Sequence, residues 1–137
     1  MSLYVLDACA LIALLQDETG ADIVDNIINS ANAEEVEIIM HKANLLEVYY
    51  DAYRSRGKDS ADLMLLEFSK LPVKVNSEIT DDIFKEAGRL KSTYKISFAD
   101  SFALAQALVS GGELLTSDHH EFNKIETSES IKIHWIR

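Results

Sequence analysis

The sequence has 137 residues, of which 47% are hydrophobic and 26% are charged. These proportions are ordinary for a folded globular protein and differ from those of disordered or fibrous chains. A chain of this length holds one hydrophobic core of normal size, so we expect a single domain over residues 1–137. The formal net charge of −10 excludes the basic class of module that binds nucleic acids by broad attraction to phosphates.

The first residues lack the pattern of a secretion signal or a membrane span. Residues 1–6 carry no basic side chain, and the apolar run 8–15 is too short to cross a membrane. The single cysteine, Cys9, cannot form an internal disulfide, and its small apolar neighbours predict a buried, unreactive thiol. Together these features predict a cytoplasmic protein in a reducing compartment, with no membrane partner.

Short apolar runs alternate with segments of helical periodicity along the chain. In chain order, the sequence predicts a strand at 3–6, helices within 11–28 with a break near 17–20, a strand at 36–40, helices at 42–54 and 60–70, a weak strand at 73–75, helices at 79–94 and 98–109, a strand at 114–117, a short helix at 119–125 and an edge strand at 131–136. This order favours the α/β class, with a parallel sheet covered by helices on both faces. Ligands of such folds bind beyond the carboxyl ends of the strands.

Acidic residues stand where a site at that edge would need them. Asp7 and Asp118 each follow directly after an expected strand, so both should project from the same edge of the sheet. Asp100 lies in the first turn of the helix at 98–109. Glu47 lies about one turn into the helix that follows the second strand. We therefore expect these side chains to converge.

Each acid alone also has an ordinary structural explanation. Asp7 or Asp118 can cap the helix that follows it. Ser97 and Asp100 have the spacing of a capping box, in which each side chain bonds the other's backbone. Glu47 belongs to a helical stripe of the kind that usually faces solvent. The other members of that stripe are Asn44, Asp51 and Arg54.

Taken together, the acids favour a metal site. Clustered carboxylates repel one another, so either a cation binds between them or some take up protons. Ligands that are all oxygen favour Mg²⁺ or Mn²⁺ over zinc, and a bound cation reverses the local charge that a phosphate meets. Such an ion activates water and stabilises a leaving oxygen, which predicts phosphodiester hydrolysis. The hydroxyls of Thr116 and Ser117, at the end of the same strand, are auxiliary candidates that can bond an acid or a metal-bound water.

Four segments resemble the motifs of the PIN-domain nucleases, and among them the VapC-type toxins of toxin–antitoxin pairs. The segments are LYVLDACALIALL at 3–15, NLLEV at 44–48, ISFADSFALA at 96–105 and LLTSDHHEF at 114–122. The resemblance covers nearly the whole chain. One departure is that Ala8 and Cys9 offer no hydroxyl where such proteins often carry serine or threonine.

The resemblance implies a three-layer α/β/α sandwich with a central parallel sheet. It implies an endoribonuclease that depends on Mg²⁺ or Mn²⁺, with Asp7, Glu47, Asp100 and Asp118 as metal ligands and catalytic residues. The substrate would be single-stranded or structured RNA. In the toxin branch the resemblance also implies a homodimer, and a small antitoxin that lays a peptide segment across the site.

The main alternative is a PIN-like protein-interaction module that is catalytically silent and keeps the acids for stability. The presence of all four acids counts against it.

Nucleotide-binding folds are disfavoured because neither a Walker loop nor a dinucleotide glycine pattern follows the first strand. His119 and His120 lack metal-ligand spacing. One helix is hydrophobic on nearly all sides, which predicts core burial for part of it and a dimer or antitoxin interface for the rest. Its apolar residues are Leu63, Met64, Leu65, Leu66 and Phe68.

Overall fold

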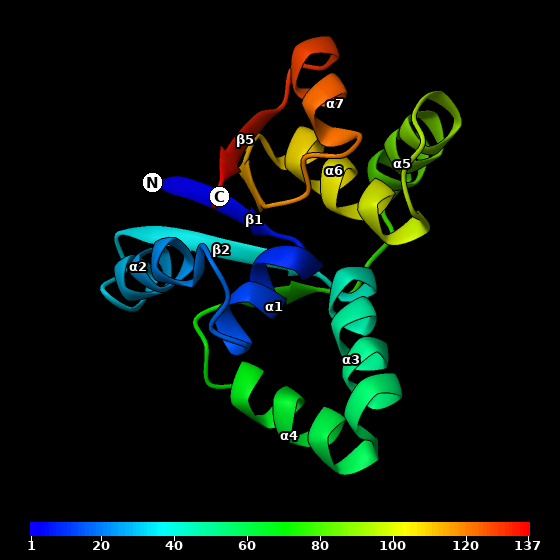
Figure 1. Ribbon diagram of the computed structural model, residues 1–137. Coiled ribbons are helices and arrows are strands. Elements are labelled where there is room, and N and C mark those ends of the chain that lie inside the picture. The colour runs from blue at the N-terminus through cyan, green and yellow to red at the C-terminus, as the bar shows by residue number, and fades with distance from the viewer.

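A five-stranded sheet forms the centre of the fold, in the order β3-β2-β1-β4-β5 (Figure 1). The computed structural model describes residues 1–137. The strands are β1 (Ser2–Leu6), β2 (Val36–His41), β3 (Lys74–Asn76), β4 (Glu113–Thr116) and β5 (Lys132–Trp135). Every pair of neighbouring strands is parallel. The carboxyl ends of all the strands therefore point toward the same edge of the sheet.

Helices cover both faces of this sheet, as the sequence predicts. They are α1 (Ala8–Leu15), α2 (Ala21–Asn32), α3 (Lys42–Arg56), α4 (Lys58–Phe68), α5 (Asp81–Thr93), α6 (Phe98–Ser110) and α7 (Phe122–Ser128). Figure 1 shows α1 and α2 on one side of the strands and α5, α6 and α7 on the other, with α3 and α4 forming a hairpin that extends away from the sheet. The architecture is the three-layer α/β/α sandwich.

The alternation of side chains along each strand divides the interior into two cores. Leu6 and Leu115 belong to the core beneath α1 and α2, whereas Val5 and Leu114 belong to the core beneath α5, α6 and α7. All four side chains are completely buried. Because successive residues of a strand point to opposite faces, this pattern fixes the register of β1 against β4, with Leu6 opposite Leu115.

Two expected helix boundaries are wrong. Helix α1 begins at Ala8 rather than near residue 11, because the Asp7 carboxylate accepts the backbone N–H of Ala10 at 2.8 Å and caps the helix. Helix α7 begins at Phe122 rather than at residue 119. A turn comes first, because the Asp118 carboxylate accepts the backbone N–H of His120 at 3.1 Å.

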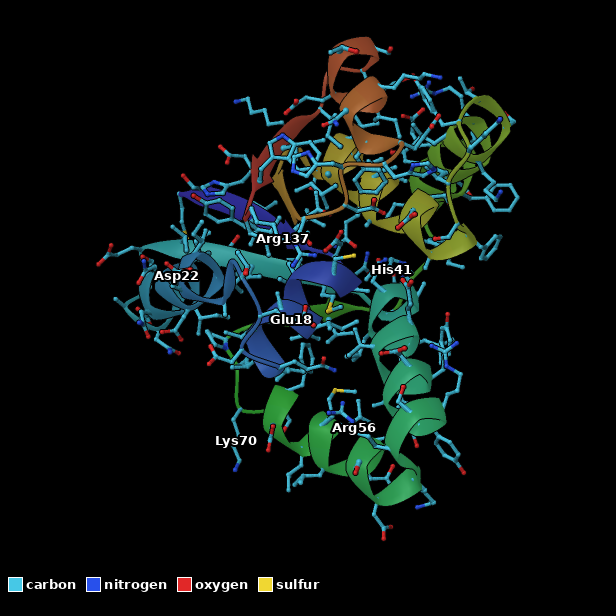
Figure 2. All side chains as sticks on the ribbon, in the orientation of Figure 1. Glu18, Asp22, His41, Arg56, Lys70 and Arg137 are labelled. Atoms are coloured by element: carbon cyan, nitrogen blue, oxygen red, sulfur yellow. The ribbon has the colours of Figure 1, made fainter.

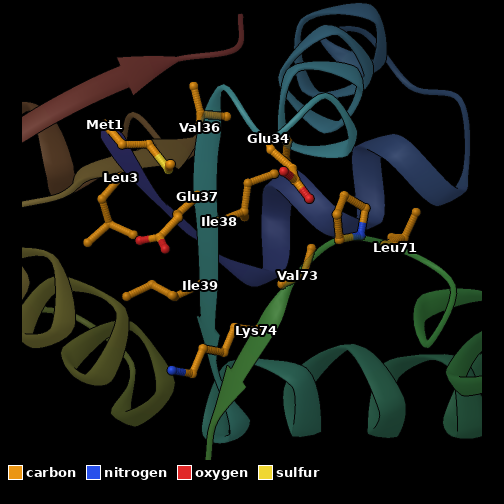
Figure 3. A pocket seen from close by; sticks show the side chains of 12 residues that line it. Met1, Leu3, Glu34, Val36, Glu37, Ile38, Ile39, Leu71, Val73 and Lys74 are labelled. Atoms are coloured by element: carbon orange, nitrogen blue, oxygen red, sulfur yellow. The ribbon is translucent and has the colours of Figure 1, made fainter.

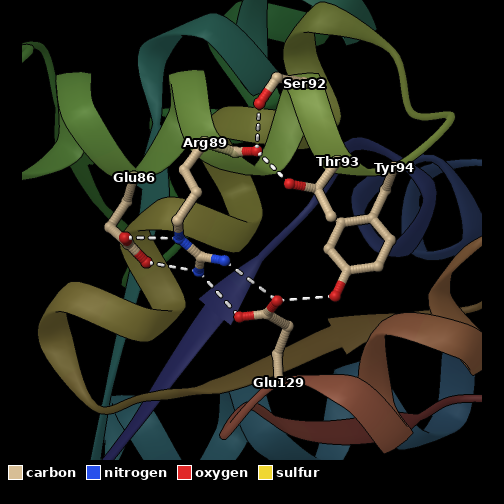
Figure 4. Close-up of polar contacts among 6 residues, drawn as sticks. All are labelled: Glu86, Arg89, Ser92, Thr93, Tyr94 and Glu129. Atoms are coloured by element: carbon tan, nitrogen blue, oxygen red, sulfur yellow. Dashed lines mark hydrogen bonds and ion pairs between the residues drawn. The ribbon is translucent and has the colours of Figure 1, made fainter.

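A cluster of charged side chains ties α5 to the segment that follows α7 (Figure 4). The Arg89 guanidinium donates to both oxygens of Glu129, at 2.8 and 3.1 Å, and also pairs with Glu86. The Tyr94 hydroxyl donates to Glu129 at 2.6 Å. These bonds lower the pKa of the Glu86 and Glu129 carboxyls. The cluster fixes the outer layer of the sandwich and contains none of the candidate acids.

A mainly apolar cavity of about 680 Å³ lies at the amino ends of β1 and β2 (Figure 3). Its walls include Met1, Leu3, Val36 and Glu37, which stand at the beginning of these strands. The cavity is therefore at the end of the sheet opposite to the candidate acids.

None of the helices combines the length and the apolar character that crossing a membrane needs.

Candidate active site

The carboxyl edge of the sheet positions each candidate acid from a different element. Asp7 follows β1 directly, and its backbone N–H donates to Leu115 of β4 at 3.4 Å. Asp118 lies two residues beyond the end of β4. Glu47 lies in the second turn of α3, the helix that begins where β2 ends, and Asp100 lies in the first turn of α6.

The acids share one electrostatic neighbourhood. The charges of Asp100 and Glu47 help to raise the pKa of the Asp7 carboxyl. The charges of Asp100 and Asp118 likewise help to raise the pKa of Glu47, and the charge of Asp118 helps to raise the pKa of Asp100. Because such effects fade with distance, residues that are far apart in the sequence lie near one another here. The structure thus brings the four acids to the same region of the sheet edge.

Asp7 is the most deeply buried of the acids, with 2% of its surface exposed. Burial raises the pKa of its carboxyl from 3.8 to about 7, and the nearby acids add to the rise. Hydrogen bonds from the Thr116 hydroxyl and the Ala10 backbone oppose it. Without a bound cation, this carboxyl carries a proton for much of the time near neutral pH.

Asp100 is both a cap and a member of the acidic group. Its carboxylate accepts the backbone N–H of Ser97 at 3.2 Å, while the Ser97 hydroxyl accepts the backbone N–H of Asp100 at 3.0 Å. The capping box expected from the sequence is therefore present. Burial raises the pKa of the Asp100 carboxyl despite these bonds. Burial likewise raises the pKa of Glu47, with Asp100 as the largest charge effect.

Thr116 connects two of the acids. This completely buried hydroxyl bonds the Asp7 carboxyl and accepts the backbone N–H of Asp118 at 3.1 Å. Ser117 is also buried, but it lies outside β4 and takes no part in the hydrogen bonds to the acids. Of the two auxiliary candidates, Thr116 alone has such contacts.

The donor chemistry at this edge fits a hard divalent cation, because carboxylate and hydroxyl oxygens predominate. His119 cannot easily join them. Its ring bonds the Arg137 carbonyl at 2.7 Å and stacks on Trp135 with centroids 3.9 Å apart. As they stand, no three His, Cys, Asp or Glu side chains of the chain are arranged so that they could hold a metal ion. The acids are neighbours, but their side chains are not closed around one point.

Cys9 lies among these acids. Burial first, and then the charges of Asp7 and Asp118, raise the pKa of its thiol to about 12. The thiol is therefore protonated at physiological pH and a poor nucleophile, in agreement with the inert cysteine that the sequence predicts. Its side chain is half-buried rather than fully enclosed.

The sequence does not predict the roles of two polar residues near the site. Asn44, expected on a solvated stripe, is 1% exposed, and its amide donates to the Ala99 carbonyl at 2.9 Å. His41, labelled in Figure 2 at the start of α3, accepts the backbone N–H of Ala43 at 3.1 Å through Nδ1 and caps that helix. A polar residue one turn before Glu47, on the same side of the helix, is the signal that could have identified Asn44.

The PIN domain family model matches residues 4–127 of the sequence. The chain therefore belongs to the PIN domain family, whose members are generally nucleases. A comparison with curated protein sequences gives no match.

Solved structures share the fold over nearly the whole chain. VapBC2 from Rickettsia felis, bound to a DNA fragment from its promoter, has a TM-score of 0.75 at 15% identity, over 96% of this chain and 97% of that one. DNA-bound VapBC from Salmonella typhimurium has a TM-score of 0.73 at 18% identity, over 100% of both chains. VapC20 from Mycobacterium tuberculosis, a sarcin–ricin loop cleaving toxin, has a TM-score of 0.67 at 17% identity, over 90% of this chain and 95% of that one.

Proposed function

We propose that the protein is a Mg²⁺- or Mn²⁺-dependent endoribonuclease and the toxin of a toxin–antitoxin pair. The observation that carries this proposal is the convergence of Asp7, Glu47, Asp100 and Asp118 from four separate elements at the carboxyl edge of the sheet. Membership of the PIN domain family supports the nuclease activity. The fold that the chain shares with VapBC proteins supports the toxin assignment.

These four carboxylates would hold the ion. When bound, a divalent ion lowers the pKa of a coordinated water and stabilises negative charge on the leaving oxygen. Asp7 would release its proton as the ion binds, because a cation favours the ionised carboxylate. Thr116 would keep Asp7 and the backbone of Asp118 in a fixed relation.

Removing divalent metal is the direct test of this proposal. We expect a chelator to abolish cleavage of single-stranded RNA, and Mg²⁺ or Mn²⁺ to restore it and raise the melting temperature. The rise in melting temperature should be larger at about pH 8 than at about pH 6, because the raised pKa of Asp7 makes protons compete with the ion at the lower pH. RNA gel assays and thermal melts with and without Mn²⁺ measure both effects.

Asp25→Asn is a suitable control variant. Asp25 is exposed on α2, a helix that carries none of the four candidate acids. Its replacement should leave both the Mn²⁺ effect and the cleavage unchanged. A protein that binds no Mn²⁺ and cleaves no RNA would instead favour the silent interaction module, for which the helix caps made by Asp7 and Asp100 already give the acids a structural role.

We also propose that the chain forms a homodimer through an apolar surface on α3, α5 and α6. Phe84 and Phe98 are 69% and 70% exposed, which is unusual for large apolar side chains. Both line a groove between α5 and α6, and Phe98 continues into a second groove with Leu46 and Tyr50 of α3. Pairing of two such surfaces would bury them from water.

The double variant Phe84→Ser, Phe98→Ser should therefore convert a dimer into a monomer. Light scattering coupled to size-exclusion chromatography measures the mass directly. Val109→Ser, at a partly exposed apolar residue near the end of α6, should remain dimeric. A monomeric parent protein, or a double variant that stays dimeric, would refute this interface.

The outer side of α4 is our proposed contact for an antitoxin. Met64 and Phe68 of this helix are buried in the core, whereas Leu63 and Leu66 are 55% and 57% exposed. The apolar character predicted for this helix is thus only partly explained by the core. Leu63 and Leu66 remain available to a partner.

A further inference from the structure

Two of the candidate ligands reach the site on helices that touch each other. Glu47 is carried by α3 and Asp100 by α6, and the two helices pack against each other. A site that binds a metal tightly needs ligands whose positions are fixed before the ion arrives. The contacts between these two helices therefore determine how the two acids are placed relative to each other.

Asn44 makes the one hydrogen bond among these contacts. Its Nδ2 atom donates to the Ala99 carbonyl at 2.9 Å, and no other hydrogen bond joins α3 to α6. Asn44 lies one turn before Glu47 on α3, and Ala99 directly precedes Asp100 on α6. The bond thus joins the two helices beside each acid. The stacking of His41 on Phe102, with centroids 4.9 Å apart, is a second contact between the start of α3 and α6.

The other end of the same amide has no partner. Asn44 is 1% exposed, and its Oδ1 atom is buried without a hydrogen bond. Leaving a buried acceptor unsatisfied costs free energy that the single Nδ2 bond recovers only in part. Leucine, which has nearly the same shape, would fill this space without that cost. Stability alone therefore does not account for an asparagine at this position.

We propose that Asn44 is a positioning residue that fixes Glu47 relative to Asp100 for binding of the divalent ion. This inference rests on the proposed function, because it assigns a role within the same metal site. Asn44 acts through the two helices rather than on the ion. Contacts that orient metal ligands typically contribute a factor of about 10 to 100 in metal affinity.

Mn²⁺ binding by the purified full chain, measured by isothermal titration calorimetry, tests the proposal. Asn44→Leu should weaken Mn²⁺ binding at least about tenfold relative to the parent, while the melting temperature of the metal-free protein stays the same or rises. This combination distinguishes positioning from a merely structural role, which would lower the melting temperature. Asn44→Ala, which removes the amide without filling its space, should weaken Mn²⁺ binding to a similar extent.

Gln106→Leu is the matched control. Gln106 is the other buried amide with an unpartnered oxygen, and it lies on α6 beside a polar cavity at β3 rather than between α3 and α6. Its replacement should leave Mn²⁺ affinity unchanged.

The experiment separates a failure of the proposed metal site from a failure of the positioning role of Asn44. A parent chain that does not bind Mn²⁺ would overturn the proposed function, and this inference with it. A parent that binds Mn²⁺, together with Asn44 variants that bind it equally well, would overturn the positioning role alone. Loss of the folded state in both Asn44 variants would also overturn it, because Asn44 would then be needed for folding rather than for metal binding.

Discussion

Replacing Asp7 with asparagine should stop RNA cleavage and, at the same time, stabilise the metal-free protein at alkaline pH. Asparagine still accepts the backbone N–H of Ala10, so the cap of α1 is retained. Loss of a carboxylate ligand should reduce cleavage at least about a hundredfold, because even contacts that only orient a ligand are worth up to that factor. The gain in stability comes from removing a buried charge.

The sign of the stability effect follows from the raised pKa. Burial moves the pKa of Asp7 from 3.8 to about 7, so the folded state binds a proton more tightly than the unfolded state. Above pH 7, ionised Asp7 therefore lowers the free energy of unfolding by about 4 kcal/mol. This loss of stability becomes smaller as the pH falls below 7 and disappears near pH 3.8. Asparagine carries no charge at any pH in this range.

Thermal melts of the parent and Asp7→Asn in chelator, over a pH series, measure this difference. The variant should melt at a higher temperature at about pH 8, and the gap should narrow steadily toward about pH 4. A variant that melts lower than the parent at alkaline pH would show that Asp7 stabilises the fold as a charged cap. Retained RNA cleavage would remove Asp7 from the catalytic group.

Asp100→Asn should reduce cleavage by a similar factor, at least about a hundredfold, with little change in stability. The asparagine oxygen can still accept the backbone N–H of Ser97, so the capping box is largely preserved. We expect no loss of unfolding free energy and a small gain at alkaline pH, because burial raises the pKa of the Asp100 carboxyl and asparagine carries no charge. RNA cleavage rates and urea unfolding of the two proteins give the comparison.

Ser97→Ala separates the two roles of Asp100. This variant removes the hydroxyl that caps α6 but leaves the carboxylate in place. We expect it to lose about 1 kcal/mol of stability and to keep most of its activity. The opposite pattern, in which Asp100→Asn unfolds readily and still cleaves RNA, would mean that Asp100 serves the helix and not the chemistry.

The sequence is sufficient to predict the layers of the fold. Val5 and Leu6 are both apolar, as are Leu114 and Leu115, and strands that are apolar on both faces belong between two layers of helices. The position of the acids follows from the same pattern. Asp7 and Asp118 come just after buried parallel strands, so their placement at one edge needs no knowledge of tertiary contacts.

What the sequence misses depends on contacts between distant segments. His119 stacks on Trp135 and bonds the Arg137 carbonyl, and no local pattern in the sequence predicts these contacts. Asn44 is similar, because its burial depends on α6 packing against α3. Local periodicity places a residue on a face of a helix but does not say what covers that face.

The separation of the carboxylates is beyond sequence reasoning for another reason. At this edge the charges of neighbouring acids help to raise the pKa of Asp7, Glu47 and Asp100, yet the side chains are not in an arrangement that could hold an ion as it stands. Side-chain positions within such a group depend on the balance between repulsion and any bound cation.

Crystals grown with Mn²⁺ test the proposed metal site most directly, because anomalous scattering locates the ion without assumptions about its ligands. We expect Mn²⁺ at the carboxyl edge of the sheet, coordinated directly by oxygens of Asp7, Glu47, Asp100 and Asp118. An ion bound elsewhere, or four carboxylates that remain apart at saturating Mn²⁺, would contradict this proposal.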